Sequence, residues 1–580
     1  MTLRSHPFSP ERHIGVMYQV DGSFADIAFN AAAQLPRTHF GEHLGRGEVG
    51  EFVIIDAGGV AIFGRVLSLG TRIEDGLAIA RQDRRIPVTG RVQLLSTLDL
   101  DGRATRGIAK YPRISDPVYA ASTEAVLAVL GAASAGNQAS IVVGQLSVDE
   151  SVEVAIPLER LFGRHLAIVG ATGSGKSWTL GHLAESVARV GGKFLLIDAT
   201  GEYRTLSGPT VKHIAIGSGE GEPHGTVVAG IPHFSMRETD RNAFLTPSSG
   251  SQLPRLRDAV RSLRLAAAIG SDMSRSDHDS LVSEDGTIRK AKVKLAKYGH
   301  AAKRYVAQME DPHSPFDIHM LAKQIQLECV WPTGRPDDTC FGDTDYSQVG
   351  YVSSLVARIN DLVQTREIMR VIHPESGVDN FLEILETWAQ DRSTPILRVS
   401  LRNLTFANHL REIVVNIIGQ ALLAHARGGV FRINPMVVAI DEAHQFFDVT
   451  VGDEFANTRL NAFEAIAKEG RKYGLTVCLA TQRPGDLPAG VLSQVGMTIV
   501  HRLADGRDRQ RIEQAAAELD HSATRLLPGL VPGEAILMGV DFPVPVSVRM
   551  HPPTSKPASD GPAFANWGSS ASTVVPAAIP

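Results

Sequence analysis

Residues 170–177 combine the residue types and the spacing that bind nucleotide phosphates. Their sequence, GATGSGKS, matches the pattern G-x-x-x-x-G-K-[ST] at every required position. In such loops the backbone N–H groups face the phosphates, a lysine contacts the β- and γ-phosphates, and a hydroxyl holds Mg²⁺. We therefore expect ATP and Mg²⁺ as cofactors, with Lys176 as the lysine and Ser177 as a metal ligand. The expected nucleotide contacts are Gly170, Ala171, Thr172, Gly173, Ser174, Gly175, Lys176, Ser177 and Trp178.

Two carboxylates follow the apolar run MVVAI at residues 436–440. Asp441 can reach the magnesium through water, and Glu442 can polarise the attacking water. This pair is typical of hydrolysing ATPases and not of kinases, which exclude water. An acidic turn at a strand end is the alternative, and we would favour it if the phosphate loop were missing. The letters DEAH also occur in superfamily-two helicases, but the long gap after the phosphate loop does not fit two tandem helicase lobes.

Two further polar residues lie in the segment 464–488. Gln482 comes directly after the apolar run LTVCLA, and its amide can sense the γ-phosphate if the sheet is RecA-like. Arg471 lies in EGRKYG, at a helix end, where it can enter a neighbouring subunit as an arginine finger. A helix-terminal arginine is also favoured by the helix macrodipole alone. Spacing leaves both interpretations of Arg471 open.

The elements that must position these residues are those of an α/β domain. HLAIVG, KFLLIDA, PILRVSL, MVVAIDEA, LTVCLATQ and MTIVHRL are apolar runs that predict a parallel sheet covered on both faces. A helix with Leu180, Leu183 and Val187 on one face follows the phosphate loop. Short β-branched runs separated by glycine turns precede this domain and predict a small β-barrel.

The fold class is therefore α/β, a RecA-like P-loop NTPase core with an N-terminal β-barrel and a helical insertion. The expected divisions are 10–112 for the barrel, 113–155 for a connector, 156–235 and 395–550 for the two parts of the core, 236–394 for the mostly helical insertion, and 551–580 for a disordered tail rich in Pro, Ser and Ala.

The composition is that of an ordinary soluble protein. Hydrophobic residues make up 43% of the chain, charged residues 21%, and the net charge is −5. This balance does not indicate a nucleic-acid binder, although a basic channel is compatible with it. The three cysteines show no metal-ligand spacing and are expected to be free thiols. The first residues lack the apolar region of a signal peptide, so we expect a cytoplasmic protein with no membrane span.

The ordered motifs resemble those of the HerA-type ATPases of the FtsK/HerA superfamily. These motifs are GRHLAIVGATGSGKS, LLIDATGEY, VVAIDEAH, EGRKYG and ATQRP, and the resemblance covers roughly residues 10 to 550. It implies a hexameric ring that translocates double-stranded DNA through its pore. It also implies that Arg164 and Arg471 reach into neighbouring sites and that Asp198, Glu202 and Tyr203 lie beside the nucleotide. One departure is DATGEY, since many relatives have Pro-His before the glycine.

The resemblance also implies a separately encoded partner. In relatives this partner is a NurA-type or defence nuclease, or a sirtuin-like NAD-hydrolysing effector, and the pair acts in DNA end processing and repair or in anti-phage defence. Three alternatives remain. The ring can be a scaffold that binds ATP and activates an effector without moving DNA. A membrane-tethered DNA pump would need a membrane span, and a metabolic kinase would need neither the barrel nor the Asp441–Glu442 pair.

Overall fold

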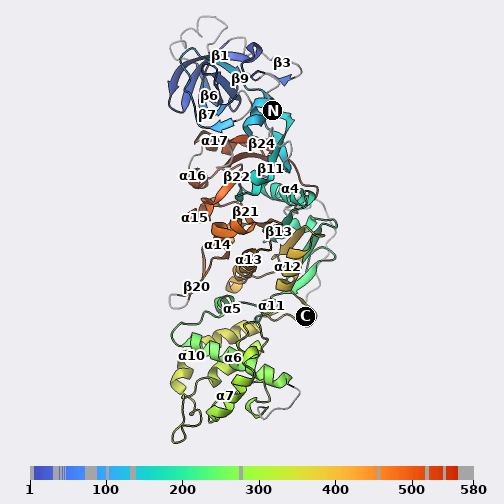
Figure 1. Cartoon of the computed structure of the whole chain (residues 1–580), viewed down its shortest axis with the longest axis vertical. Coiled ribbons are helices and arrows are strands. Elements are labelled where there is room, and N and C mark those ends of the chain that lie inside the picture. The colour runs from blue at the N-terminus through green and yellow to red at the C-terminus, as the bar shows by residue number, and fades with distance from the viewer. Residues whose placement is uncertain are drawn as a thin grey trace, which may run out of the picture.

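The computed structural model describes residues 6–30, 38–39, 42–43, 45, 47–71, 88–99, 104–130, 139–272, 279–453, 457–515, 521–539 and 544–558. The molecule is elongated, with a β-barrel at one end, an α/β domain in the middle and a helical insertion at the other end (Figure 1). Among the described helices, none is long and apolar enough to cross a lipid bilayer.

The N-terminal barrel is a sheet with the strand order β2-β1-β9-β5-β6-β7-β8, which closes because β2 also pairs with β7. Its strands are β1 (His13–Asp21), β2 (Phe24–Phe29), β5 (Phe52–Asp56), β6 (Ala61–Thr71), β7 (Val88–Leu98), β8 (Ala104–Arg106) and β9 (Pro117–Ala120). The short strands β3 (Thr38–His39) and β4 (Glu42–His43) pair only with each other. Because β9 pairs with both β1 and β5, the barrel extends beyond residue 112.

A sheet of 13 strands forms the α/β domain, in the order β11-β10-β24-β23-β22-β12-β21-β18-β13-β17-β14-β15-β16. Its parallel strands are β12 (His165–Val169), β13 (Lys193–Asp198), β14 (Val211–Ile216), β15 (Val227–Gly230), β16 (Asp379–Asn380), β17 (Ile396–Ser400), β18 (Met436–Ile440), β21 (Leu475–Thr481) and β22 (Val495–His501). Antiparallel strands extend one edge: β10 (Ser140–Leu146), β11 (Asp149–Pro157), β23 (Glu534–Gly539) and β24 (Val546–Met550). The expected connector thus contributes β10 and β11 to this sheet.

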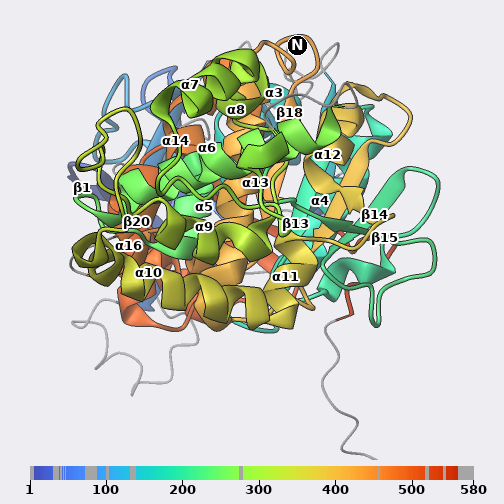
Figure 2. The same ribbon diagram turned by 90° about the horizontal axis from the view of Figure 1, so that it is seen from below.

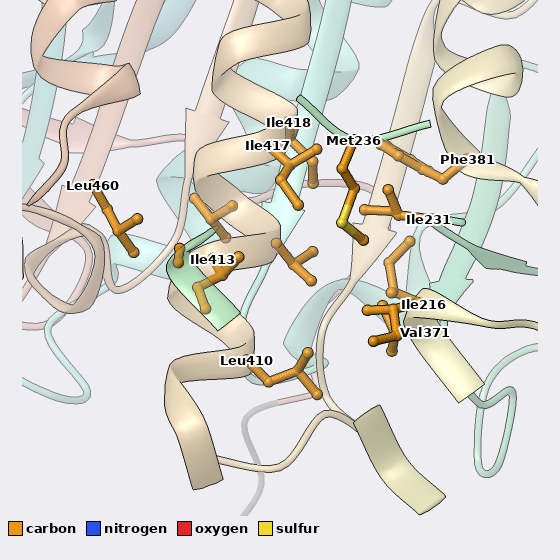
Figure 3. Close-up of a cluster of buried hydrophobic side chains, with 14 of the residues drawn as sticks. Ile216, Ile231, Met236, Val371, Phe381, Leu410, Ile413, Ile417, Ile418 and Leu460 are labelled. Atoms are coloured by element: carbon orange, nitrogen blue, oxygen red, sulfur yellow. The ribbon is translucent and has the colours of Figure 1, made fainter. Parts of the chain in front are cut away.

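The central strands are buried on both faces, which explains their continuous apolar sequences. In β13, Leu195 and Ile197 face a core that includes helix α13 (Leu410–Arg427), whereas Phe194 and Leu196 face a core that includes helix α4 (Lys176–Arg189). This alternation follows from the two-residue period of a strand. Figure 3 shows Ile413, Ile417 and Ile418 of α13 packed near Ile216 and Ile231.

The insertion lies between β15 and β17. Its helices are α5 (Glu238–Leu245), α6 (Gln252–Ser271), α7 (Leu295–Arg304), α8 (Val306–Glu310), α9 (Leu321–Leu327), α10 (Tyr346–Gln364), α11 (Arg366–Ile372) and α12 (Phe381–Gln390). Seen from below, α6, α9 and α10 cover this end of the molecule (Figure 2). The expected fold class, with its barrel and its helical insertion, is confirmed.

The segment 551–558 is ordered against the α/β domain, so the expectation of a disordered tail beginning at residue 551 is wrong there. The backbone N–H groups of Thr554 and Ser555 each donate to the Glu185 carboxylate at 2.8 Å, and Ala558 N donates to Glu202 O at 2.7 Å. Proline-rich sequence prevents a regular strand, but an extended segment can still satisfy its remaining donors on a neighbour. Residues 559–580 lie outside the described residues.

Candidate nucleotide site

The phosphate loop connects β12 to α4, at the carboxyl ends of the parallel strands. Gly173 and Gly175 have φ angles of +71° and +116°, which glycine adopts without strain. Gly170 is required for space, because a Cβ there would lie 2.6 Å from the Cβ of His501 and from Ser174 Oγ. The first turn of α4 begins at Lys176, so its free N–H groups open toward the loop. The loop therefore has the conformation that phosphate binding needs.

His501, the last residue of β22, supports the loop from beneath. Its Nδ1–H donates to Glu534 O at 2.8 Å, which leaves Nε2 to accept from the Thr179 hydroxyl at 2.9 Å. Burial lowers the pKa of His501 to about 4, and the charge of Lys176 adds to this effect, so the imidazole is neutral at pH 7. Sequence reasoning missed His501. The only available signal was a histidine at the end of an apolar run.

Asp441 and Glu442 follow β18 and lie at the same edge of the sheet. Burial raises the pKa of Asp441 well above its usual range, and the nearby carboxylates of Asp198, Glu442 and Glu202 raise it further, whereas Lys176 lowers it. Glu442 has a φ of +49°, and its Oε2 is buried without a hydrogen-bond partner, as is Oε2 of Glu202. A cation beside this group of carboxylates would offset their mutual repulsion, so the residues fit a bound Mg²⁺.

Gln482 reaches the phosphate loop from the neighbouring strand. Strand β21 lies between β12 and β18 and is parallel to both. Gln482 Oε1 accepts a hydrogen bond from the Thr172 hydroxyl at 2.6 Å. Next to it, His444 Nδ1 lies 3.2 Å from Thr481 Oγ1 and 3.4 Å from Glu442 Oε2. The amide therefore lies where a change at the phosphates can be passed to β21.

Asp198 stabilises a turn next to the site and is not among the residues that line the nucleotide cleft. Its carboxylate accepts from Gly201 N at 2.7 Å, Tyr203 N at 3.1 Å and Arg398 Nε at 2.7 Å, and it is fully buried. Arg398 also pairs with Glu222 at 2.6 Å. This buried network orients the segment that carries Glu202 and Tyr203.

Tyr203 lies at the phosphate-loop side of that segment. Burial raises the pKa of the Tyr203 hydroxyl, which lies beside Ser177.

A cleft of about 580 Å³ adjoins the phosphate loop. It is lined by Thr172, Gly173, Gly175, Lys176, Ser177, Trp178, Thr179, Glu202, Glu442, Pro532, Gly533, Arg549, Met550, His551 and Pro552. The last six were not expected, because they lie just before β23, in β24 and in the segment after β24. Gly533 N donates to Ser174 O at 3.0 Å, and Met550 N donates to Gly533 O at 2.8 Å. Trp178 is 37% exposed and forms one wall.

Arg164 and Arg471 lie at the opposite edge of the sheet. Arg164 immediately precedes β12, and Arg471 lies in the turn Gly470–Tyr473 that precedes β21. Since β12 and β21 are parallel neighbours, both arginines lie at amino ends, one strand length (roughly 17 Å for β12) from the phosphate loop. Arg471 also helps burial to lower the pKa of His165. The structure brings these two arginines toward each other and away from this chain's own cleft.

Comparison with known proteins identifies two matching family models, "Helicase HerA, central domain" over residues 141–319 and "Helicase HerA-like C-terminal" over residues 432–559. A probable helicase of Methanocaldococcus jannaschii is 23% identical over 80% of this chain and 76% of its own length. The DNA double-strand break repair helicase HerA of Sulfolobus acidocaldarius is 24% identical over 86% of this chain and 88% of its own length. Among solved structures, the bacterial conjugative coupling protein TrwB aligns with a TM-score of 0.40 and 14% identity, over 70% of this chain and 88% of that chain.

Proposed function

Because the chain belongs to the HerA family of ATP hydrolases, we propose that it is a Mg²⁺-dependent motor that forms a hexameric ring and moves double-stranded DNA through it. The observation that carries this proposal is the separation of the site's parts. The phosphate loop, the carboxylate pair and Gln482 lie at one edge of the sheet, and Arg164 and Arg471 lie at the other. Such a site is completed only when a second copy presents its arginine edge.

Within one chain, each residue of the cleft has a separate task. Lys176 and the start of α4 bind the phosphates, and Ser177 together with Asp441 would hold Mg²⁺. The metal, when bound, neutralises charge on the phosphate oxygens. Glu442 accepts the proton of the attacking water, and its buried Oε2, which accepts no hydrogen bond, fits that task. Gln482 senses the γ-phosphate through its contact with the loop.

The arginines act between subunits. Arg471 is exposed at the amino edge, where a neighbouring cleft in a ring can receive it as an arginine finger. Arg164, which is half-buried, immediately precedes β12 at the same end of the sheet and is the second candidate. An arginine finger contributes about 10³ to 10⁵ in rate, so hydrolysis would depend strongly on assembly.

We further propose that a separately encoded partner supplies the chemistry that acts on DNA or on a signal. The candidates are a NurA-type or defence nuclease and a sirtuin-like NAD-hydrolysing effector, with a role in DNA repair or in anti-phage defence. The barrel is the proposed docking platform, because it projects from the end of the molecule opposite to the insertion (Figure 1). The relative from Sulfolobus acidocaldarius carries double-strand break repair in its name, which supports action on double-stranded DNA.

The decisive experiment is steady-state ATP hydrolysis with and without linear double-stranded DNA. Glu442→Ala serves as the blank, and Glu386→Ala, an exposed glutamate on α12, serves as the matched control. Stimulation by DNA that is lost only in Glu442→Ala supports the motor. If DNA does not change the hydrolysis rate, either with the protein alone or with the product of the neighbouring gene added, the motor proposal is contradicted. An ATP-binding scaffold is then favoured.

A further inference from the structure

A second cavity, of about 260 Å³, lies where the insertion meets the α/β domain. Helices α5 and α6 form two of its walls, and the segment from Glu310 to Leu321 forms a third. None of its lining residues also lines the nucleotide cleft. It is therefore a separate feature of the molecule.

Positive charge dominates the lining of this cavity. Four arginines line it, Arg241, Arg257, Arg261 and Arg264, and only two carboxylates do, Glu238 and Glu310. Both carboxylates are already engaged at the rim, where Glu238 pairs with Arg257 at 2.5 Å and Glu310 pairs with Arg261. These four rim side chains are about half exposed, so solutes have access from solvent.

The two inner arginines have no such partner. Among the residues that the structure describes, no carboxylate lies within ion-pairing distance of Arg241 or Arg264. Arg264 is only 6% exposed, and its Nη2 donates to Pro312 O at 2.6 Å, but its Nε is buried with no acceptor. Arg241 donates to Met236 O at 2.6 Å. Carboxylates nearby, among them Glu238, act on both charges from a distance, but none forms an ion pair with either guanidinium, and buried charges are ordinarily paired.

Burial disfavours the charged form of both guanidinium groups. It lowers the pKa of Arg241 to about 10, and the charge of Arg264 contributes to that shift. His233, which also lines the cavity, has its pKa lowered by burial to about 4 and is neutral at pH 7. The lining therefore has two more arginines than carboxylates, and the two arginines without an ion pair are Arg241 and Arg264.

Apolar side chains form the rest of the lining. They include Phe244, Leu256, Val260, Phe316 and Leu362. A small inorganic ion would leave these walls in contact with water. An anion with an apolar body would bury them and would pair with the arginines at the same time.

We propose that this cavity is a binding site for a small organic anion, in which one carboxylate or phosphate group pairs with Arg241 and Arg264 and an apolar body fills the remaining space. The site is independent of nucleotide hydrolysis. It lies at the base of the insertion, so a bound ligand would contact residues at the junction between the insertion and the motor domain.

The test uses 4-(trifluoromethyl)benzoate as the probe and ¹⁹F NMR of the full-length protein as the readout. The matched neutral probe is 4-(trifluoromethyl)benzamide, which has the same body without the charge. We expect the benzoate to bind at least about tenfold more tightly than the amide, because a charge-assisted hydrogen bond is worth about twice a neutral one. Unlabelled phenylphosphonate and benzoate, added as competitors, distinguish a phosphate-type from a carboxylate ligand.

Variants locate the binding. Arg264→Gln and, separately, Arg241→Gln should each weaken benzoate binding about tenfold or more, whereas Arg255→Gln should not. Arg255 lies on the same helix as Arg264 but pairs with Asp258 outside the cavity, which makes it the matched control. Arg241→Gln keeps the test valid if Arg264→Gln does not fold. Equal binding of benzoate and benzamide by the natural protein, or unchanged benzoate binding in both cavity variants, would overturn the proposal.

Discussion

At the scale of single residues, the nucleotide site is a set of buried polar groups whose charges oppose one another. Glu442 and Glu202 both raise the pKa of the buried Asp441, whereas a single lysine, Lys176, lowers it. Two of the carboxylate oxygens there accept no hydrogen bond, although His444 Nδ1 lies 3.4 Å from the one on Glu442. Such an arrangement costs free energy in the protein without ligand, and a cation bound with a nucleotide would offset that cost.

Replacing Glu442 by Gln should separate binding from hydrolysis. The amide keeps the shape of the side chain but cannot accept the proton of water, so turnover should fall about 10²- to 10⁴-fold. The affinity for a fluorescent ATP analogue should change little, because Lys176 and the loop are untouched. Phosphate release and analogue binding measure the two effects, and a parallel loss of both would contradict the role of Glu442.

His501 should make stability depend on pH. Its folded pKa of about 4 lies below the ordinary value of 6.5, so its contribution is complete above pH 6.5 and is lost as the pH falls from 6.5 to 4. Through this shift the residue contributes about 3 kcal/mol at most. Thermal unfolding of His501→Gln should show a shallower pH dependence in that window. The exposed His224 gives the control, and equal slopes for His501→Gln and His224→Gln would argue against this account.

At the scale of elements, segments distant in sequence close the site. The segment 551–558 crosses α4, is anchored on Glu185, and contributes His551 and Pro552 to the cleft. Gly181 of α4 lies beneath it, and a Cβ there would be in ordinary contact with Pro553 at 3.4 Å. The helix that begins with the phosphate loop is thereby held from its outer face.

Glu185→Ala should release this segment. Two backbone N–H groups lose a charged acceptor, and hydrogen bonds to charged groups are worth about 1.5–3 kcal/mol. Hydrogen exchange at the amides of Thr554 and Ser555 should accelerate by about 10- to 100-fold. Glu159→Ala, at an exposed glutamate on the short helix Leu158–Phe162, should leave exchange at both amides unchanged. Unaltered exchange in Glu185→Ala would show that the anchoring lies elsewhere.

Asp240 links α5 to α13 and should stabilise the fold only at low pH. It accepts from Asn416 Nδ2 at 3.1 Å, and burial raises its pKa to about 6. Because that value lies above the ordinary one, its contribution is complete below about pH 4 and is lost as the pH rises through 6. Asp240→Asn should therefore raise the melting temperature at pH 8 and have little effect near pH 4. The half-exposed Asp258 supplies a control, and a gain for Asp240→Asn that does not grow with pH would contradict this reasoning.

At the scale of the whole molecule, the separation of the two sheet edges decides what one chain can do alone. The carboxyl edge holds the cleft, and the amino edge holds Arg164 and Arg471. If Arg471 acts on a neighbour as proposed, a single copy has an incomplete site and an arginine that only another copy can use. We expect hydrolysis to rise steeply with protein concentration as copies assemble.

Mixing two inactive variants should restore activity if Arg471 acts on a neighbour. Arg471→Ala keeps an intact cleft, and Lys176→Ala keeps an intact arginine edge, so mixed rings contain some sites with both parts. ATP hydrolysis by the mixture should exceed that of either variant alone. Proven exchange of subunits without any gain in rate would exclude action of Arg471 in trans.

Much of the site was predictable because its parts are local in sequence. The phosphate loop needs glycine, lysine and serine at fixed spacing between a strand and a helix, and covalent geometry sets that spacing. Asp441 and Gln482 each follow a buried strand directly, and parallel strands bring such ends to one edge. The sequence by itself therefore determined the fold class and the chemistry of the nucleotide cleft.

Only the tertiary structure decided which distant groups support that chemistry. Examples are His501, which contacts the helix after the loop, Arg398, which pairs with Asp198, and the two residues His551 and Pro552 that line the cleft after β24. The order of strands in the sheet brings all of these segments together. A buried side chain takes its role from the partners that packing supplies, and sequence spacing does not record them. For the same reason Asp198 accepts hydrogen bonds from a turn, and two arginines of the insertion line a cavity without forming an ion pair there.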